Sequence, residues 1–291
     1  MVDLLVERET FGHGGNQEVV RPFAAAGDVE LLLVTPQMQS FEAGKKAEAG
    51  EVPLSEEDVP HWDDDFPFWQ STTVELEGRT VSFRRIVMPM VENDEDMANW
   101  LDSVAVDAVV CSGSRRNVSM WENWMAPTAS LVRASANAGR PTLGICFGHQ
   151  LLCHALGATI ERADSLSSGI WDLDFTEIGV DDELLTSHVS DDSCVAGLFT
   201  HQDHVMSVPE SCSLLCSTSH NGVTAVRVLS EDGEPLPSWG IQFHPEAARA
   251  RIERAHEWGH ISDEELASFK GEHDGASILS SFATVVGRYE A

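Results

Sequence analysis

The chain has 291 residues, of which 42% are hydrophobic, so it can bury one large core or two modest ones. Its net charge of −30 comes from 48 acidic residues against 18 basic ones. Binding to a nucleic-acid backbone or to anionic lipid is therefore disfavoured, because both require a basic surface.

The N-terminal third mixes predicted strands with polar segments. In chain order we expect a buried strand at 29–35, a polar surface excursion with acidic clusters at 41–69, a hairpin at 73–87 and a helix at 94–103. No convincing linker follows. We therefore predict one domain over residues 1–291, in which residues 1–105 form an elaborated N-terminal part.

Beyond residue 105, predicted strands and helices alternate. We expect a strand at 106–111, a helix at 127–138, a strand ending at Cys146, a helix at 150–156, short strands at 158–162, 171–178, 213–217, 224–228 and 238–243, and helices at 252–258, 263–269 and 278–289. This order is typical of α/β proteins. The predicted fold class is three-layer α/β, in which helices cover both faces of a mainly parallel central sheet that contains a strand–nucleophile elbow–helix.

Residues 142–150 read Thr-Leu-Gly-Ile-Cys-Phe-Gly-His-Gln and place a cysteine between two glycines at the end of an apolar run. A strand that turns sharply into a helix holds its turn residue in a strained conformation, and small neighbours permit the tight bend. The helix N-terminus then favours negative charge on the sulfur. Cys146 is therefore the predicted nucleophile, since a buried structural cysteine would not require Gly144 and Gly148.

A second motif, Gly240-Ile-Gln-Phe-His-Pro-Glu246, offers a histidine with a carboxylate two residues later. Successive strand side chains alternate, so His244 and Glu246 can share one face and the glutamate can orient the imidazole. A satisfied core histidine beside an ordinary surface acid is the alternative interpretation. Together with Cys146, the pair predicts an activated nucleophile with its base and orienting group.

The Cys146 elbow, the segment Thr200-His-Gln-Asp-His-Val205 and the later His-Pro-Glu resemble a class I glutamine amidotransferase domain. Their order and spacing are most similar to the glutaminase domain of GMP synthase, and the similarity runs from about Asp107 to Glu246. This resemblance implies that Cys146, His244 and Glu246 form a catalytic triad that releases ammonia from glutamine.

Acyl transfer also requires backbone N–H donors for the developing oxyanion. The N–H of Phe147, next after the nucleophile, is one expected donor. The second is expected from the turn after the strand at 106–111, where Gly113 permits an amide to face the site. The family usually has a Gly-Gly or Gly-Pro turn here, whereas this chain has Ser112-Gly113-Ser114; an ordinary strand-end turn would read the same way.

Three further residues are assigned to substrate binding by the resemblance. Gln150 matches the family glutamine that contacts the substrate, and it lies one helical turn after Cys146. The family usually has His-Gly-Asp where this chain has His201-Gln202-Asp203, and backbone groups there hold the α-amino and carboxylate ends of glutamine. We therefore also expect Gln202 and Asp203 at the substrate.

No metal or organic cofactor is expected. Cys212, Cys216 and His220 are spaced by four, but on a strand each pair would be about 13 Å apart, which is too far for one tetrahedral ion. Residues 12–15 are glycine-rich but lack the strand and the lysine that a P-loop requires. Without an ATP loop, the chain would have to pass its ammonia to a separate synthetase subunit.

The composition also suggests a compartment. No apolar run reaches the ~18–20 residues of a transmembrane helix, and the first residues do not form a signal peptide. Six cysteines, one of which needs a free thiol, are best suited to a reducing cytoplasm. An acid-rich chain with lysine only at positions 45, 46 and 270 is typical of a protein solvated in concentrated salt.

The function predicted from the sequence is that of a glutaminase or glutamine amidotransferase which serves a separate synthetase. One alternative is a γ-glutamyl hydrolase, in which the same triad acts on a γ-glutamyl amine or peptide and the acidic excursion suits a cationic polyamine. A second alternative is a non-catalytic regulatory subunit, which would have no chemical need for Cys146, His244 and Glu246 together.

Overall fold

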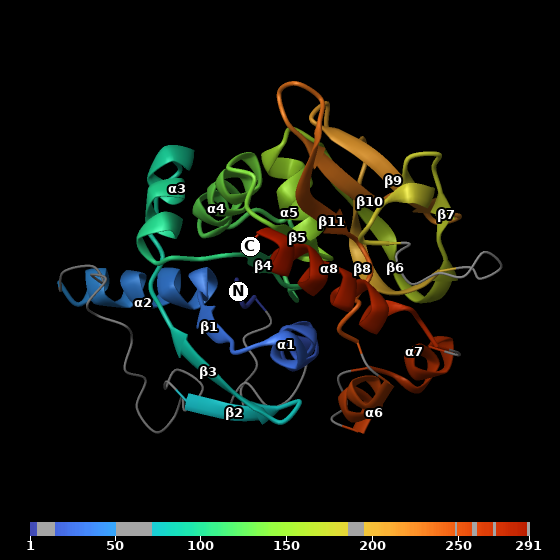
Figure 1. Ribbon diagram of the computed structural model, residues 1–291, viewed down its shortest axis with the longest axis horizontal. Coiled ribbons are helices and arrows are strands. Elements are labelled where there is room, and N and C mark those ends of the chain that lie inside the picture. Colours follow the sequence, from blue (N-terminus) through green and yellow to red (C-terminus); the bar gives the residue numbers. More distant parts are fainter. Residues whose placement is uncertain are drawn as a thin grey trace.

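The computed structural model describes residues 1–4, 15–50, 72–185, 195–247, 249–257, 261–269 and 272–289 (Figure 1). Its helices are α1 (Gly15–Ala26), α2 (Pro36–Glu48), α3 (Asp94–Ser103), α4 (Met125–Asn137), α5 (Phe147–Ala155), α6 (Arg249–Glu257), α7 (Asp263–Ser268) and α8 (Gly275–Tyr289). None of the described helices is long and apolar enough to cross a membrane.

The strands form three sheets by hydrogen bonding. They are β1 (Glu30–Leu33), β2 (Thr72–Leu76), β3 (Arg79–Arg85), β4 (Val109–Cys111), β5 (Thr142–Ile145), β6 (Ile160–Asp172), β7 (Asp174–Phe175), β8 (Ala196–Val205), β9 (Cys212–Thr218), β10 (Asn221–Leu229) and β11 (Pro235–Ile241). The largest sheet has six strands in the order β4-β5-β11-β10-β9-β7, a second has the order β1-β3-β2, and β6 pairs with β8.

Residues 1–4 join the two larger sheets. Val2 bridges in parallel to both Val34 and Cys111, so this short segment lies between β1 and β4. Val2 N–H donates to Val110 O at 2.7 Å, and Asp3 N–H donates to Val34 O at 2.8 Å. We call residues 1–4 the seam, because they make one continuous sheet out of two.

The predicted mainly parallel arrangement holds for the centre of this sheet. The β3–β1, β4–β5 and β5–β11 pairs are parallel, as is the seam with each of its neighbours. Outside this centre, β2–β3 on one side and β11–β10–β9–β7 on the other are antiparallel. Of these antiparallel pairs, β2–β3, β9–β10 and β10–β11 are hairpins that need only short turns, whereas parallel neighbours require a longer crossover connection.

Helices cover both faces of the sheet, as predicted (Figure 1). Successive residues of β4 point to opposite sides, so Val109 and Cys111 pack with α3, α4 and α5, whereas Val110 packs with α1 and α8. Leu143 and Ile145 of β5 join the second cluster. The three-layer α/β class is therefore confirmed.

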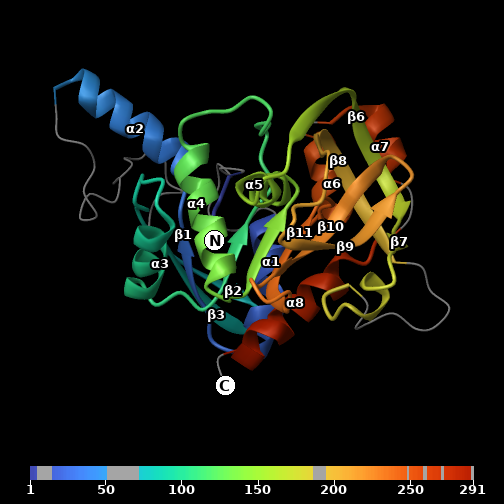
Figure 2. The same cartoon turned by 90° about the horizontal axis from the view of Figure 1, so that it is seen from above.

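The β6–β8 sheet lies beside the end of β11, near α6 and α7 (Figure 2). Leu198 of β8 packs with Ala247, Ile252 and Phe269 in a small apolar cluster. The backbone N–H of His244 donates to Leu198 O at 2.7 Å. This bond fixes the chain just after β11 against β8, which brings two distant segments together at one edge of the sheet.

Several elements differ from the sequence prediction. Helix α1 was not predicted; it contains Pro22, which ordinarily ends a helix. Residues 41–48 of the predicted polar excursion belong to helix α2, and residues 51–69 lie outside the described residues. The two strands predicted at 158–162 and 171–178 are mostly one strand, β6, with a register shift between Arg162 and Ser167.

Candidate active site

Cys146 lies at the sharp turn between β5 and α5, with φ of 50° and ψ of −100°. A positive φ is rare for a residue with a side chain and marks local backbone strain. A Cβ at Gly148 would lie 2.2 Å from the Cys111 carbonyl oxygen, and one at Gly144 would lie 2.6 Å from the Gly148 oxygen. The two glycines therefore allow the helix to approach the strands closely enough to form the elbow.

His244 and Glu246 lie in a turn that follows β11. The His244 Nδ1–H donates to Glu246 Oε1 at 2.7 Å, and the side chains are buried, with exposures of 8% and 2%. The pairing was predicted, but its expected cause was wrong: β11 ends at Ile241, so strand alternation does not place the two residues. Pro245 between them has no N–H, which prevents continuation of a sheet ladder.

The environment of His244 favours its protonated form. Burial by itself would lower the imidazole pKa, but the charge of Glu246, the charge of Cys146 and hydrogen bonds to both side chains raise the pKa to about 10. The ring therefore interacts with the carboxylate through Nδ1 and with the sulfur as well. Cys146 is 5% exposed, and its sulfur lies 3.9 Å from the Thr200 carbonyl oxygen.

Gly113, which follows β4, lies against this pair. A Cβ at position 113 would be 2.8 Å from His244 Cε1 and 3.8 Å from Cys146 Cβ. Ser112 Oγ donates to the Gly113 carbonyl at 3.0 Å and accepts from Leu4 N–H at 3.0 Å, so the seam supports this turn. The Gly113 backbone therefore approaches His244 and Cys146 at a distance that only glycine permits.

Phe147 is the first residue of α5, where backbone N–H groups have no partner inside the helix. Its ring stacks on Trp124 with centroids 5.7 Å apart. The predicted oxyanion donors, Phe147 and Gly113, therefore both lie next to Cys146 in sequence or in space. Their roles remain predictions.

A known protein family matches much of the chain. The sequence profile "Glutamine amidotransferase class-I" matches residues 72–255, which is more than half of the chain. The chain belongs to this family.

Curated relatives match a shorter stretch. A glutamine-hydrolysing GMP synthase subunit of Methanocaldococcus jannaschii is 33% identical over 114 residues, which is 38% of this chain and 54% of that protein. The Halobacterium salinarum subunit of the same name is 32% identical over 37% of this chain and 54% of its own length. Gamma-glutamyl peptidase 3 of Arabidopsis thaliana is 29% identical over 58% of this chain and 64% of its own length. The chain thus matches only about half of each GMP synthase subunit.

Solved structures share the fold at low sequence identity. A putative GMP synthase subunit from Thermoplasma acidophilum superposes with a TM-score of 0.51 and 15% identity, covering 91% of this chain and 96% of that chain. A glutamine amidotransferase from Methylobacillus flagellatus gives a TM-score of 0.51 at 18% identity over 72% of this chain and 83% of that one. These likenesses support the amidotransferase fold.

Within this amidotransferase, Gln150 lies one turn after Cys146, as predicted, but its side chain is buried. Its Nε2 donates to the Asp203 carbonyl at 2.9 Å and to Gln242 Oε1 at 3.1 Å. The amide nitrogen is therefore held by the chain itself. A role for Gln150 at the substrate stays a prediction.

Asp203 and Gln202 alternate along β8 and have different surroundings. Asp203 is 1% exposed, and its carboxylate accepts two hydrogen bonds from Ser119, one from the backbone N–H at 2.8 Å and one from Oγ at 2.7 Å. Gln202 instead accepts from Arg162 at 2.7 Å and donates to the Ala163 carbonyl at 2.9 Å, both on β6. Both side chains therefore have their hydrogen-bond partners within the protein.

Two buried histidines close to Cys146 and His244 had no predicted role. His149 Nε2 bonds to the Val223 carbonyl at 3.1 Å, and burial lowers its pKa to about 4. His201 Nδ1 donates to the Asp203 carbonyl at 2.9 Å, and burial lowers its pKa to about 3. His201 lies within the family segment 200–205, and this position was the available signal for it.

Cys212, Cys216 and His220, the residues weighed as metal ligands, lie on β9 and the turn after it. Among the described residues, no three His, Cys, Asp or Glu side chains gather in an arrangement that could hold a metal ion. His220 instead bonds to Thr218 and packs on Trp171, with ring centroids 4.1 Å apart.

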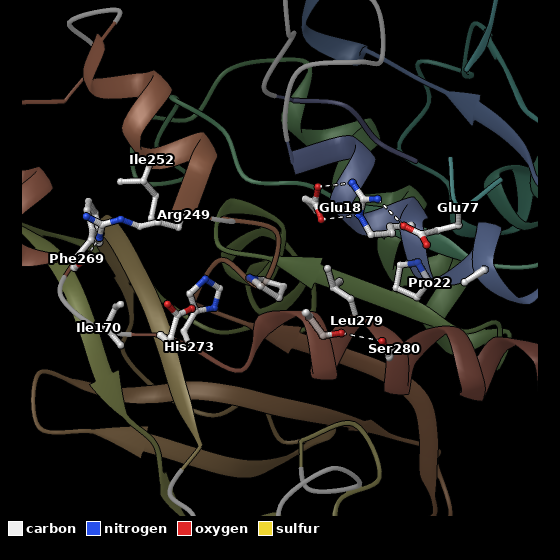
Figure 3. Close-up of a pocket in the computed structure, with 15 residues that line it drawn as sticks. Glu18, Pro22, Glu77, Ile170, Arg249, Ile252, Phe269, His273, Leu279 and Ser280 are labelled. Atoms are coloured by element: carbon white, nitrogen blue, oxygen red, sulfur yellow. Dashed lines mark hydrogen bonds and ion pairs between the residues drawn. The ribbon is translucent and has the colours of Figure 1, made fainter. Parts of the chain in front are cut away.

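A cavity of about 430 Å³ lies behind the triad turn, between α1, α6 and α8 (Figure 3). Pro245 lines it, and His273 Nε2 donates to the Ala247 carbonyl at 3.0 Å. Across the cavity Arg21 bonds to Glu18 and Glu77. The Arg21 side chain is thus paired with two carboxylates that line the same cavity.

Proposed function

We propose that this chain is a glutaminase that releases ammonia from the side-chain carboxamide of glutamine through a cysteinyl thioester. The arrangement of Cys146, His244 and Glu246 is the observation that carries the proposal, because it joins an elbow cysteine to a protonated, carboxylate-bound imidazole. Membership of the class I amidotransferase family supports the same chemistry.

The first half-reaction forms the thioester. The Cys146 sulfur attacks the carboxamide carbon, and the carbonyl oxygen becomes an oxyanion that the N–H groups of Phe147 and Gly113 stabilise. The carbon–nitrogen bond then breaks, and His244 gives its proton to the leaving nitrogen, which departs as ammonia. The raised pKa of His244 supports this order, since the proton to be delivered is already on the ring.

The second half-reaction regenerates the enzyme. A water molecule gives one proton to His244 and attacks the thioester carbon. The carbon–sulfur bond breaks, glutamate leaves, and the sulfur returns to the neighbourhood of the protonated imidazole. Glu246 stays bonded to Nδ1 throughout and stabilises the positive ring without taking its proton.

The ammonia would be used by a separate synthetase subunit. Relatives named as one subunit of a glutamine-hydrolysing GMP synthase support this partner class. We also propose that the described residues form one domain, because the seam binds the N-terminal sheet directly to β4. Concentrated salt in the native environment would screen the net charge of −30.

Hydrolysis of a γ-glutamyl amine or peptide is the second candidate. The match to gamma-glutamyl peptidase 3 covers 58% of the chain, a larger share than the GMP synthase matches cover. The same triad would cleave the γ-glutamyl amide, with an amine or peptide as leaving group in place of ammonia. The two functions differ in the leaving group and share the acyl intermediate.

One assay series separates these functions. Purified chain is incubated with glutamine and with γ-glutamyl amines and peptides, in low salt and in molar salt, and release of ammonia and glutamate is measured. Ammonia from glutamine supports the glutaminase, and cleavage of γ-glutamyl amines or peptides alone supports the second candidate. If neither substrate class is turned over in low salt or in molar salt, our proposal is contradicted and the non-catalytic regulatory subunit is favoured.

Cys146→Ala is the control for that series. It should lower turnover by at least about 10⁴-fold, because no other group replaces the nucleophile. Its urea unfolding midpoint should match that of the unmodified chain. Turnover that survives this substitution would show that the sulfur is not the nucleophile.

A further inference from the structure

Asp203 is a buried carboxylate that binds another segment of the chain. It lies on β8, and both of its oxygens accept from Ser119. One bond comes from the backbone N–H and the other from the hydroxyl, so the carboxylate binds two atoms of Ser119. Hydrogen bonds to an ionised acceptor are stronger and more directional than neutral ones.

Ser119 belongs to the segment 112–124, which we call the β4–α4 loop. Its first residues place Gly113 against His244, and its last residue, Trp124, stacks on Phe147. Both ends of the loop therefore touch the groups proposed to react. Asp203 holds the loop between these two contacts.

The backbone of Asp203 adds two more connections. Its carbonyl oxygen accepts from Gln150 Nε2 and from His201 Nδ1, each at 2.9 Å. Gln150 lies on the elbow helix, one turn after the nucleophile. A single residue thus links the elbow helix and β8, and through Ser119 also the β4–α4 loop.

We propose that Asp203 is a positioning residue for the oxyanion site, and that its carboxylate fixes the loop so that the Gly113 N–H points at the developing charge. This proposal rests on the glutaminase function proposed above. It assigns Asp203 a role through the protein rather than through the substrate, since Ser119 occupies both carboxylate oxygens.

The charge and both oxygens of Asp203 are needed for this role. In Asp203→Asn, the amide oxygen can still accept from the Ser119 backbone N–H, but the new NH₂ group faces Ser119 Oγ, whose hydroxyl must turn to accept. Both bonds lose the charge that strengthens them. Ser119→Ala removes the hydroxyl alone and keeps the backbone N–H, so it is a milder form of the same change.

The kinetic test uses the full chain with glutamine. Asp203→Asn should lower kcat by roughly 10- to 100-fold while KM changes by less than about threefold, because the oxyanion forms only along the reaction path. Ser119→Ala should lower kcat by a smaller factor, and Ser119→Thr, which keeps the hydroxyl, should restore it. The double variant should lose less than the product of the two single factors, since both substitutions act on the same Ser119–Asp203 contact.

Two further readouts separate positioning from general damage. Alkylation of Cys146 by iodoacetamide, followed by mass spectrometry, should stay within about twofold of the unmodified rate, because the triad is untouched. Amide hydrogen exchange in residues 113–124 should rise in Asp203→Asn. Asp182→Asn is the matched control: its buried carboxylate binds Trp239 and Arg227, so it should change neither kcat nor exchange in the loop.

The inference fails if Asp203→Asn raises KM more than it lowers kcat, which would indicate direct substrate contact, or if loop exchange is unchanged. Should Asp203→Asn not fold, unchanged kcat in Ser119→Ala would overturn it as well. If the unmodified chain hydrolyses no γ-glutamyl substrate, the proposed function fails. Hydrogen exchange still tests the role of Asp203 in that case, because unchanged exchange in the β4–α4 loop of Asp203→Asn would show that Asp203 does not fix the loop.

Discussion

The turn after β11 and the helix α5 each bury a histidine, and the two imidazoles have pKa values on opposite sides of neutrality. The pKa of His244 is raised to about 10, whereas that of His149 is lowered to about 4. Burial lowers the pKa in both cases. The difference is that His244 meets the charges of Glu246 and Cys146, while His149 bonds to the backbone of Val223 and to the Cys153 sulfur.

This comparison shows that burial alone does not set the protonation state of a histidine in this fold. In the neutral His149 ring, Nε2–H donates to the Val223 carbonyl and Nδ1 accepts from the Cys153 thiol, and the ring then packs between α5 and β11. A carboxylate on one side and a sulfur on the other stabilise a charged ring, which can carry a proton to a leaving group. The predictions below test each half of the comparison.

Among the variants that test this comparison, Glu246→Gln should have the largest effect, because it removes the charge that distinguishes His244 from His149. The pKa of His244 should fall, and kcat/KM for glutamine should drop by about 10³- to 10⁴-fold. Steady-state kinetics across pH would measure both changes. Activity within tenfold of the unmodified chain would show that the carboxylate charge does not matter.

Gly240→Ala tests the packing around the neutral His149. A Cβ at this position would lie 2.5 Å from His149 Nδ1, so helix α5 or the ring must move. We expect a loss of about 1–3 kcal/mol in the free energy of unfolding, measured with urea. Gly222→Ala is the control, since no atom lies within 4 Å of its added Cβ. Equal stability of the two variants would contradict the tight packing at His149.

The pH dependence of stability should have opposite signs for the two kinds of histidine. His149 and His201 are neutral when folded, so their contribution is complete above pH 6.5 and is lost as the pH falls toward about 4 and 3. Each would add a slope of about 1.4 kcal/mol per pH unit in that window. His244 behaves inversely: its contribution is complete below pH 6.5 and is lost as the pH rises to about 10.

Urea unfolding of the unmodified chain and of His149→Gln at several pH values checks this sign. The variant should show a shallower fall in stability between pH 6.5 and 4. An identical fall would mean that His149 is already charged in the folded chain or is not buried there.

Gly113→Ala should have the smallest effect. It tests the close approach of the Gly113 backbone to the charged His244. The added Cβ would push on His244 Cε1 while Glu246 still holds the ring. We expect kcat/KM to fall by about tenfold, with less than about 1 kcal/mol lost in unfolding free energy. A variant as active as Gly222→Ala would show that Gly113 is no closer to the reacting groups than any exposed glycine.

The elbow could be predicted from the sequence because its requirements are local. Gly144 and Gly148 are needed within four residues of each other, and the apolar run before them is continuous. The pairing of His244 with Glu246 was also predicted, although Pro245 creates a turn where a strand was expected. Short spacing limited the possible arrangements in both motifs.

The polar contacts around Asp203 could not be predicted in the same way. Ser119 and Asp203 are 84 positions apart, and Gln150 and Gln242 are 92 apart. These bonds depend on how a loop folds and on the register of β6 against β8, which has a shift that no sequence pattern announces. The family resemblance predicted that Asp203 belongs to the site, but only the structure identifies Ser119 as its partner.

The seam has a consequence for the order in which the chain folds. Residue 2 must find partners near residues 34 and 111, so it can pair only after both β1 and β4 have formed. Contacts this distant in sequence slow folding, because the intervening chain must first be ordered. We expect the Asp3 amide to gain protection late in a refolding experiment with pulsed hydrogen exchange. Protection there before the β4–β5 pair would reverse this order and make the first residues a nucleus rather than a closing step.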